Sequence, residues 1–217
     1  MIFNGHPPAC SRIEVPLPGL LETALARLQR QSHYARLLAR GGAGAAGMRD
    51  WLTRAADCIA ANARPEAVFM PVAAELRPEG LRIAGRVTLD GADVVRDIAR
   101  GGAVTAYLLT LNYDQSTAFE WLARDYGAHH VQSDLASEVL FALGRHAHRA
   151  MKDQGAAGRL RRIPVQASGQ CGQRRHWDPS RVQALLSVFG AANPGVSVTD
   201  SGCFQPLNSL LGLAVSY

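Results

Sequence analysis

VFMPVAAEL-RPEG-LRIAGRV, residues 68–87, is the stretch that decides the fold class. It contains two runs of mainly aliphatic residues, 68–76 and 81–87, and the Pro78 and Gly80 between them suit a tight turn. The stretch therefore predicts a β-hairpin. Because a hairpin pairs its strands antiparallel, at least part of the sheet is expected to be antiparallel.

Three further stretches have the composition of strands. Residues 103–111 form an almost unbroken apolar run that suits a central strand, and residues 195–199 and 210–215 predict two shorter strands. Helical patterns stand in groups before and between these strands. This order predicts an α+β fold with a mixed, mainly antiparallel sheet and flanking helices, rather than a doubly wound parallel sheet.

The first helices follow from apolar residues at helical spacing. Residues 19–31 are amphipathic, a Gly/Ala stretch at 41–47 interrupts the pattern, and residues 48–59 predict a second helix. Asp90 is expected to cap a short helix that ends near Arg100.

Two more helices are expected in the second half of the chain. From Asp114 the helical pattern runs to about Lys152, and it fits either one long helix or two helices broken near Gly127. Pro179, preceded by an aspartate, suits the first position of another helix, which extends to Gly190.

The length and composition favour one structural domain. With 217 residues, 47% of them hydrophobic, the chain can bury one substantial core. Residues 1–66 are expected to form a helical lead-in to a main region at 67–217. No apolar run approaches the roughly 20 residues of a spanning helix, and residues 1–8 lack the pattern of a secretory signal. The expectation is a cytoplasmic protein that binds no membrane.

The net charge of +5 comes from arginine, because Lys152 is the only lysine. Two arginine clusters could form a positive surface that attracts an acidic partner or phosphate groups, and the first cluster is expected to be exposed and to help dock an acidic electron carrier. Nucleic-acid binding is the weaker alternative, since no aromatic residues are interleaved with the clusters. The clusters consist of Arg159, Arg161 and Arg162, and of Arg174 and Arg175.

The sequence gives little evidence for a metal site or for a hydrolase active site. The four cysteines form no Cys-x-x-Cys pair, and no two histidines stand at the i, i+4 spacing that places two ligands on one helix face. A Gly-x-Ser-x-Gly motif is absent. Cys171 with His176 remains a less favoured nucleophile pair, because sequence does not show whether they approach each other.

A glycine-rich segment is the best candidate for a ligand-binding loop. Glycines let backbone amides approach a ligand closely, and serine and glutamine side chains offer hydrogen bonds. A structural turn explains the segment equally well when it is considered alone. Its candidate contacts are Ala167, Ser168, Gly169, Gln170 and Cys171.

Several short motifs stand in a fixed order around this segment. They are DYGAHHV at 125–131, LASE at 135–138, SGQ at 168–170, GVSVTDS at 195–201 and PLNSLLGL at 206–213. In order and spacing these motifs resemble the activation domain of cobalamin-dependent methionine synthase, as a stand-alone activation subunit, and the resemblance covers about residues 68–217. Where that family has a Leu-Thr-Glu-Ser motif, this chain has Val198-Thr199-Asp200-Ser201.

This resemblance implies a crescent-like domain that binds S-adenosylmethionine and presents it to a cobalamin carried by a partner. The implied partner is a corrinoid-binding protein or methionine synthase. One electron from a flavodoxin-like or ferredoxin-like donor and the methyl group of S-adenosylmethionine would restore methylcobalamin. Such a domain supplies positioning rather than acid–base chemistry, so no catalytic residue is expected.

The chain departs from the family at the ligand loop. Val165 stands where the family has the arginine that engages the ligand carboxylate, Ser168 replaces a proline, and Gln170 replaces a tyrosine. Loss of that arginine removes about 1.5–3 kcal/mol of binding free energy. The candidate substitutes are Arg162, three residues upstream, and Arg174 and Arg175 just after the loop, and Asp200 keeps the family's carboxylate. Two hypotheses follow: a working activation subunit, and a non-catalytic relative that docks a corrinoid protein or electron carrier without binding S-adenosylmethionine.

Overall fold

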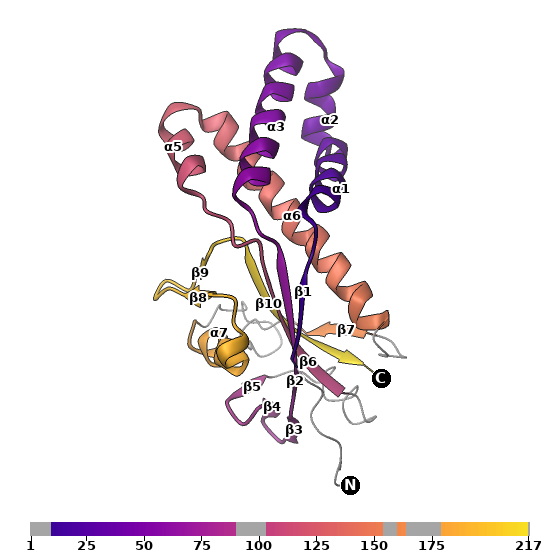
Figure 1. The fold of residues 1–217 in the computed structure, drawn as a ribbon, viewed down its shortest axis with the longest axis vertical. Coiled ribbons are helices and arrows are strands. Elements are labelled where there is room, and N and C mark those ends of the chain that lie inside the picture. The colour runs from indigo at the N-terminus through magenta and orange to yellow at the C-terminus, as the bar shows by residue number, and fades with distance from the viewer. Residues whose placement is uncertain (1–9, 90–102, 154–159, 164–178, 217) are drawn as a thin grey trace.

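A five-stranded antiparallel sheet organises the computed structural model, which describes residues 10–89, 103–153, 160–163 and 179–216 (Figure 1). The predicted α+β fold is confirmed. The apolar run at 103–111 is the middle strand, as expected, and every strand pair among the described residues is antiparallel. In sheet order the strands are β1 (Ser11–Glu14), β2 (Glu66–Val72), β6 (Ala103–Thr110), β10 (Ser209–Ser216) and β7 (Leu160–Ile163).

The predicted hairpin is correct in its turn but wrong in both strands, because the run at 81–87 also divides, with a turn after Ile83 and a new strand from Val87. The run at 68–76 divides into β2 and β3 (Ala74–Arg77), and only β3 pairs with β4 (Gly80–Ile83). With β5 (Val87–Leu89) these form a separate three-stranded sheet. The division follows burial, because β2 is fully buried as far as Phe69 and therefore belongs to the central sheet, whereas most of β3 is exposed.

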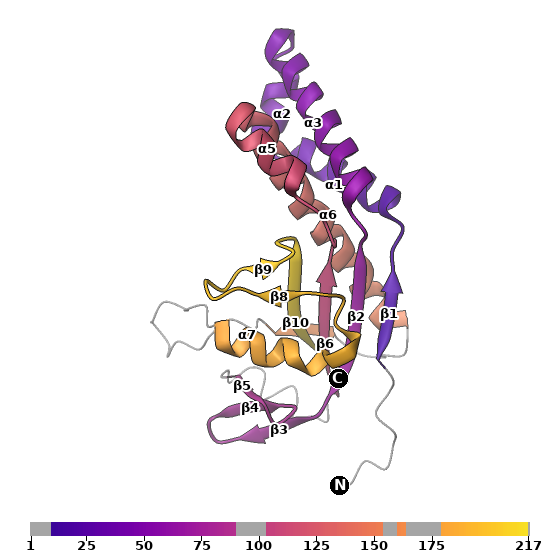
Figure 2. The same cartoon turned by 60° about the vertical axis from the view of Figure 1, so that its left-hand side comes forward.

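Helices cover one face of the sheet and extend past its end as a helical lobe (Figures 1 and 2). The predicted helix at 19–31 is confirmed as α1, whereas α2 had no counterpart among the expected elements. The first 66 residues also supply β1, an edge strand that the sequence did not reveal. The helices of this face are α1 (Leu17–Arg30), α2 (Ser32–Ala39), α3 (Gly42–Asn62), α5 (Ser116–Arg124) and α6 (Tyr126–Asp153).

The expectation that the Gly/Ala stretch at 41–47 interrupts the helices is wrong for most of its length. Residues 42–47 form the first turns of α3, where Ala45 is fully buried and Met48 is 6% exposed. Packing outweighs the low helix propensity of glycine there. These residues also match the Gly-x-Gly-x-x-Gly spacing of dinucleotide sites, but they follow a helix instead of a strand, so the required context is missing.

The pattern that begins at Asp114 forms two helices, which confirms the second of the two alternatives. The break lies at Asp125, whose carboxylate accepts a hydrogen bond from Ala128 N at 3.1 Å and caps α6. Arg54 Nη1 donates to the same carboxylate at 2.8 Å. Gly127 is required because an added Cβ would lie 2.4 Å from the Trp51 ring.

The opposite face carries a second core. There α7 (Pro179–Leu186) and the following 3-10 turn η1 (Ser187–Ala192) pack with β4 and β5 on the central strands. Alternate β6 side chains divide between the faces: Leu108 joins this core, and Leu109 joins the helix-covered one. The short hairpin of β8 (Ser197–Val198) and β9 (Phe204–Gln205) completes the layer. The predicted strand at 210–215 is confirmed as β10, and that at 195–199 is shorter than expected.

The expected helix from Asp90 and the aspartate cap of α7 lie outside the described residues. Among the described helices, none is long and apolar enough to cross a membrane.

Candidate functional site

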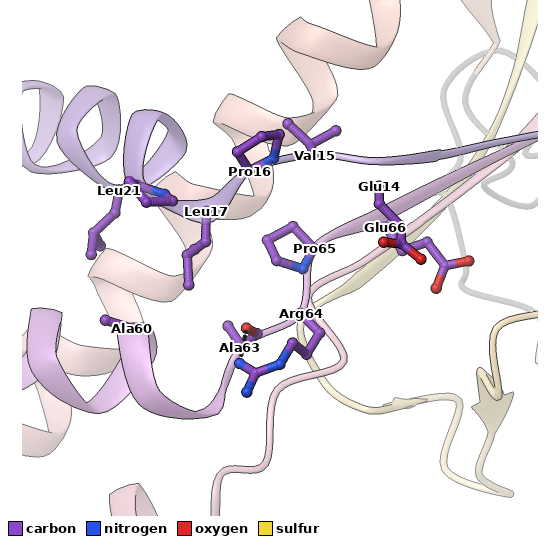
Figure 3. Close-up of a pocket in the computed structure, with 11 residues that line it drawn as sticks. Glu14, Val15, Pro16, Leu17, Leu21, Ala60, Ala63, Arg64, Pro65 and Glu66 are labelled. Carbon is purple, nitrogen blue, oxygen red and sulfur yellow. Dashed lines mark hydrogen bonds between the residues drawn. The ribbon is translucent and has the colours of Figure 1, made fainter.

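A cleft of about 770 Å³ lies at the base of the helical lobe, where β1 leads into α1 and α3 leads into β2 (Figure 3). Small-molecule sites are typically about 300–1,000 Å³ and mostly apolar, so the cleft has a suitable size and lining. It is lined by Glu14, Val15, Pro16, Leu17, Pro18, Leu21, Ala60, Ala63, Arg64, Pro65 and Glu66.

Prolines and alanines keep this cleft open. Pro16 precedes α1, Pro18 is its second residue, and Pro65 precedes β2. Proline fixes φ and has no N–H. The connection from β1 to α1 and the connection from α3 to β2 are therefore stiff and form few backbone hydrogen bonds. The bond from Val15 N to Pro65 O is long, at 3.4 Å. Ala60 and Ala63 in the wall are small, so side chains do not fill the space between the two connections.

Two carboxylates stand at the sheet end of the cleft (Figure 3). Glu14 and Glu66 are register partners on adjacent strands, so their side chains share one face of the sheet. Glu66 is only 7% exposed, and its Oε1 accepts a short hydrogen bond from Arg12 Nε. That bond and the charge on Glu66, with a smaller contribution from Glu14, raise the pKa of Arg12. Arg12 is therefore paired with Glu66, and Glu14 adds negative charge nearby.

Arg64 supplies a positive group on another part of the wall. Its Nη1 donates to Ala63 O at 2.8 Å and to Ala61 O at 3.4 Å, at the C-terminal end of α3. The guanidinium points away from the two carboxylates (Figure 3). The cleft therefore offers separate acidic and basic groups beside an apolar wall. This combination suits a ligand that carries an ammonium group, a carboxylate and an apolar body.

The C-terminal motif at 206–213 has structural roles at the same end of the sheet. Ser209 Oγ donates to Pro206 O at 2.8 Å and forms a hydroxyl–hydroxyl hydrogen bond of 2.9 Å with Thr110 Oγ1. Asn208 accepts a short hydrogen bond from Gln115 Nε2, and its carbonyl accepts from Leu111 N at 3.0 Å. These bonds tie the start of β10 to the end of β6 and to the start of α5.

Two smaller cavities flank α6. One of about 240 Å³ lies between α5, α6 and the start of β10, and its lining includes Phe119, His129 and Leu207. The other, of about 150 Å³, lies between α6 and the central strands, and its lining includes Tyr107 and Arg145. Both fall below the usual size of a complete small-molecule site, so neither would enclose a nucleoside by itself.

The structure separates the described members of the predicted site from the cleft. Asp200 is exposed in the turn between β8 and β9 and lines none of the three cavities above. Arg162 lies on β7, where its backbone pairs with Ala214, and β7 and β1 are opposite edges of the sheet. The sequence interpretation missed Glu14 and Glu66. The only available signal was a glutamate at each of two strand–helix junctions, which is weak.

The rest of the predicted site lies outside the described residues. This holds for Ala167, Ser168, Gly169, Gln170 and Cys171, as well as for Val165, His176 and the arginines at 159, 174 and 175. Their contact with a ligand or partner stays a prediction. Across the described ranges, no group of three or more His, Cys, Asp or Glu side chains could hold a metal ion.

The fold and cleft together define an α+β domain with a ligand-sized site beside an edge strand. A solved structure with this fold is the crystal structure of the MetH reactivation domain bound to AdoHcy. The two are 16% identical in sequence with a TM-score of 0.61, and the match covers 97% of this chain and 79% of that one. At this identity the likeness shows a shared fold. No protein-family model and no curated protein matches the chain.

Proposed function

We propose that the chain binds S-adenosylmethionine and supports the reductive methylation of a cobalamin held by a partner protein, as a methionine synthase activation subunit. The fold it shares with a reactivation domain bound to AdoHcy, over nearly its whole length, carries this proposal. AdoHcy is S-adenosylmethionine without the transferred methyl group, so a site for one accommodates most of the other. The motif order from residue 125 onward points in the same direction.

The cleft at the base of the helical lobe is our candidate for the S-adenosylmethionine site. The ligand's ammonium and sulfonium groups are positive and match Glu14 and Glu66, while Arg64 can turn from its two carbonyls toward the ligand carboxylate. The apolar wall suits the adenosine. In this role the chain's residues bind and orient the methyl donor, and the cobalamin supplies the methyl acceptor chemistry.

The corrinoid-binding partner would approach from the same end of the sheet. One register row runs from Glu14 through Glu66 and Thr110 to Ser209. Three strand spacings of about 4.8 Å place the ends of this row roughly 15 Å apart. Phe119 and Leu207 are exposed apolar side chains near Ser209 that suit a protein interface. Each is 51% exposed, and both line the small cavity that Asn208 also lines.

A second candidate function rests on the altered ligand loop. With Val165 in place of the family arginine and Gln170 in place of the tyrosine, the chain would be a non-catalytic relative. It would keep a docking surface for a corrinoid protein or a flavodoxin-like or ferredoxin-like electron carrier, without binding S-adenosylmethionine.

Calorimetry of the full chain with S-adenosylmethionine and with AdoHcy tests the first proposal. We expect micromolar binding that Glu14→Gln weakens about tenfold, as for one charged hydrogen bond. Ala60→Trp should block the cleft by size. Glu22→Gln, an exposed glutamate of α1 outside the cleft, is the control of equal charge change.

The outcomes separate the candidates. If neither ligand binds at millimolar concentration, the first proposal is refuted and the chain is the non-catalytic relative. Binding that survives both cleft variants but is lost in Arg162→Ala would move the ligand to the loop after β7 and refute the cleft as its site. Binding that also survives Cys171→Ser would remove any role for that thiol.

A further inference from the structure

The outer end of the helical lobe carries a group of exposed arginines, which we call the basic end. It consists of Arg30, Arg36, Arg40 and Arg49, from the last turn of α1, from α2 and its C-cap, and from the first half of α3. Between Glu22 and Asp50 the sequence contains no acidic residue. Figure 1 shows α2 and the start of α3 at the end of the lobe farthest from the sheet.

The charges of the basic end are not neutralised within the described part of the protein. Arg30, Arg40 and Arg49 make no ion pair or side-chain hydrogen bond there, and Arg36 Nε donates to Ser32 O at 3.0 Å. Arginines closer to the sheet behave differently. Arg27 Nε pairs with Glu138 at 3.1 Å, a bond that attaches α1 to α6. The outer arginines therefore contribute charge without a structural role that the described contacts reveal.

Two features add to the positive potential and shape of this end. The α3 helix is 21 residues long, begins without a side-chain cap and has no acidic residue in its first turn, so its positive dipole end is uncompensated. Leu37 lies on α2 between Arg36 and Arg40 and is 37% exposed. Leu37 thus adds an exposed apolar side chain to an arginine-rich segment, and arginine is enriched at protein interfaces relative to the rest of the surface.

We propose that the basic end docks an acidic protein surface that has an apolar centre. The positive charge of the basic end favours a partner with negative charge, and the exposed apolar side chain of Leu37 favours a protein as that partner. No Phe, Tyr or Trp of α1, α2 or α3 is exposed, so these helices lack the aromatic platform typical of proteins that bind single-stranded nucleic acid. A membrane-surface helix needs a broad apolar face, and α2 exposes one leucine. The proposal does not depend on ligand binding in the cleft at the other end of the lobe.

The test uses the full chain and two labelled peptides followed by fluorescence anisotropy at about 50 mM salt, where charge effects are weakly screened. One peptide is polyglutamate; the other is a glutamate-rich amphipathic helix with leucines along one face. The double variant Arg36→Glu/Arg40→Glu reverses two charges of the basic end. Arg124→Glu/Arg149→Glu reverses two exposed arginines on α5 and α6 and is the matched control for overall charge. Circular dichroism checks that both variants fold.

We expect the basic-end variant to lose about tenfold or more in affinity for both peptides, while the control loses less than about twofold. Leu37→Ser should weaken only the amphipathic peptide. Equal losses in the two charge variants would show that only the net charge matters and would overturn the proposal. So would tighter binding of a 20-base-pair DNA duplex, or of phosphatidylglycerol vesicles, that depends on Arg36 and Arg40.

Discussion

Replacing Gly212 by alanine should destabilise the fold through one identifiable contact. Gly212 lies on β10 directly opposite Tyr107 of β6, and the tyrosine ring crosses over the glycine. An added Cβ would lie 2.3 Å from both Cζ and Oη of Tyr107, far inside contact distance. Tyr107 is 7% exposed and belongs to the core on the helix-covered face, so a shift of its ring would disturb that packing. Overpacking of this kind costs about 1–3 kcal/mol.

Thermal and urea unfolding followed by circular dichroism measure this effect. For a chain of this size, the expected loss lowers the melting temperature by about 2–10 °C. Gly144→Ala is the control: its Cβ would lie 3.5 Å from a Leu109 methyl, an ordinary contact, and its place inside α6 predicts a gain of about 0.5–1 kcal/mol. Tyr107→Leu in the Gly212→Ala background should recover stability. A neutral Gly212→Ala, or one that Tyr107→Leu does not rescue, would refute the reasoning.

Three other predictions concern ionisable groups and thiols. The hydrogen bond from the α6 backbone and the Arg54 guanidinium lower the pKa of Asp125. Its contribution to the stability of the fold is therefore present above about pH 4 and lost as the pH falls. Asp125→Ala should lower the melting temperature at pH 7 and have less effect at pH 2.5. Burial raises the pKa of Tyr113, so its contribution to stability is present below about pH 10 and declines above it. In an absorbance titration Tyr113 should ionise only when the chain unfolds. Ionisation before unfolding would contradict its burial. In a Cys171→Ser background, Cys10 and Cys203 should react quickly with a thiol reagent and Cys58 only in denaturant, and a fast third thiol would count against the packing of α3.

Sequence patterns predicted the elements whose environment is uniform along their length. The run at 103–111 is apolar on both faces because both faces of β6 are covered, so composition alone identifies a central strand. The break before α6 was predictable to within two residues, because a glycine and a nearby aspartate mark helix ends. The division of 68–76 was not predicted, because it depends on the strand with which each part pairs: β2 pairs with β6, and β3 pairs with β4.

The amino-acid sequence by itself determined the α+β class, the central strand, a helix that begins at Pro179 and the motif order that resembles the activation domain, since these depend on local periodicity and spacing. The expected end of that helix at Gly190 was wrong, because the α-helix ends at Leu186 and a 3-10 turn follows. Only the tertiary structure decided that residues 11–14 form an edge strand, that the Gly/Ala stretch is helical, and that Glu14 and Glu66 meet at a cleft. These features depend on residues 52 positions or more apart in the chain, or on burial against another helix. Such contacts arise from packing and strand register, which a local pattern does not encode.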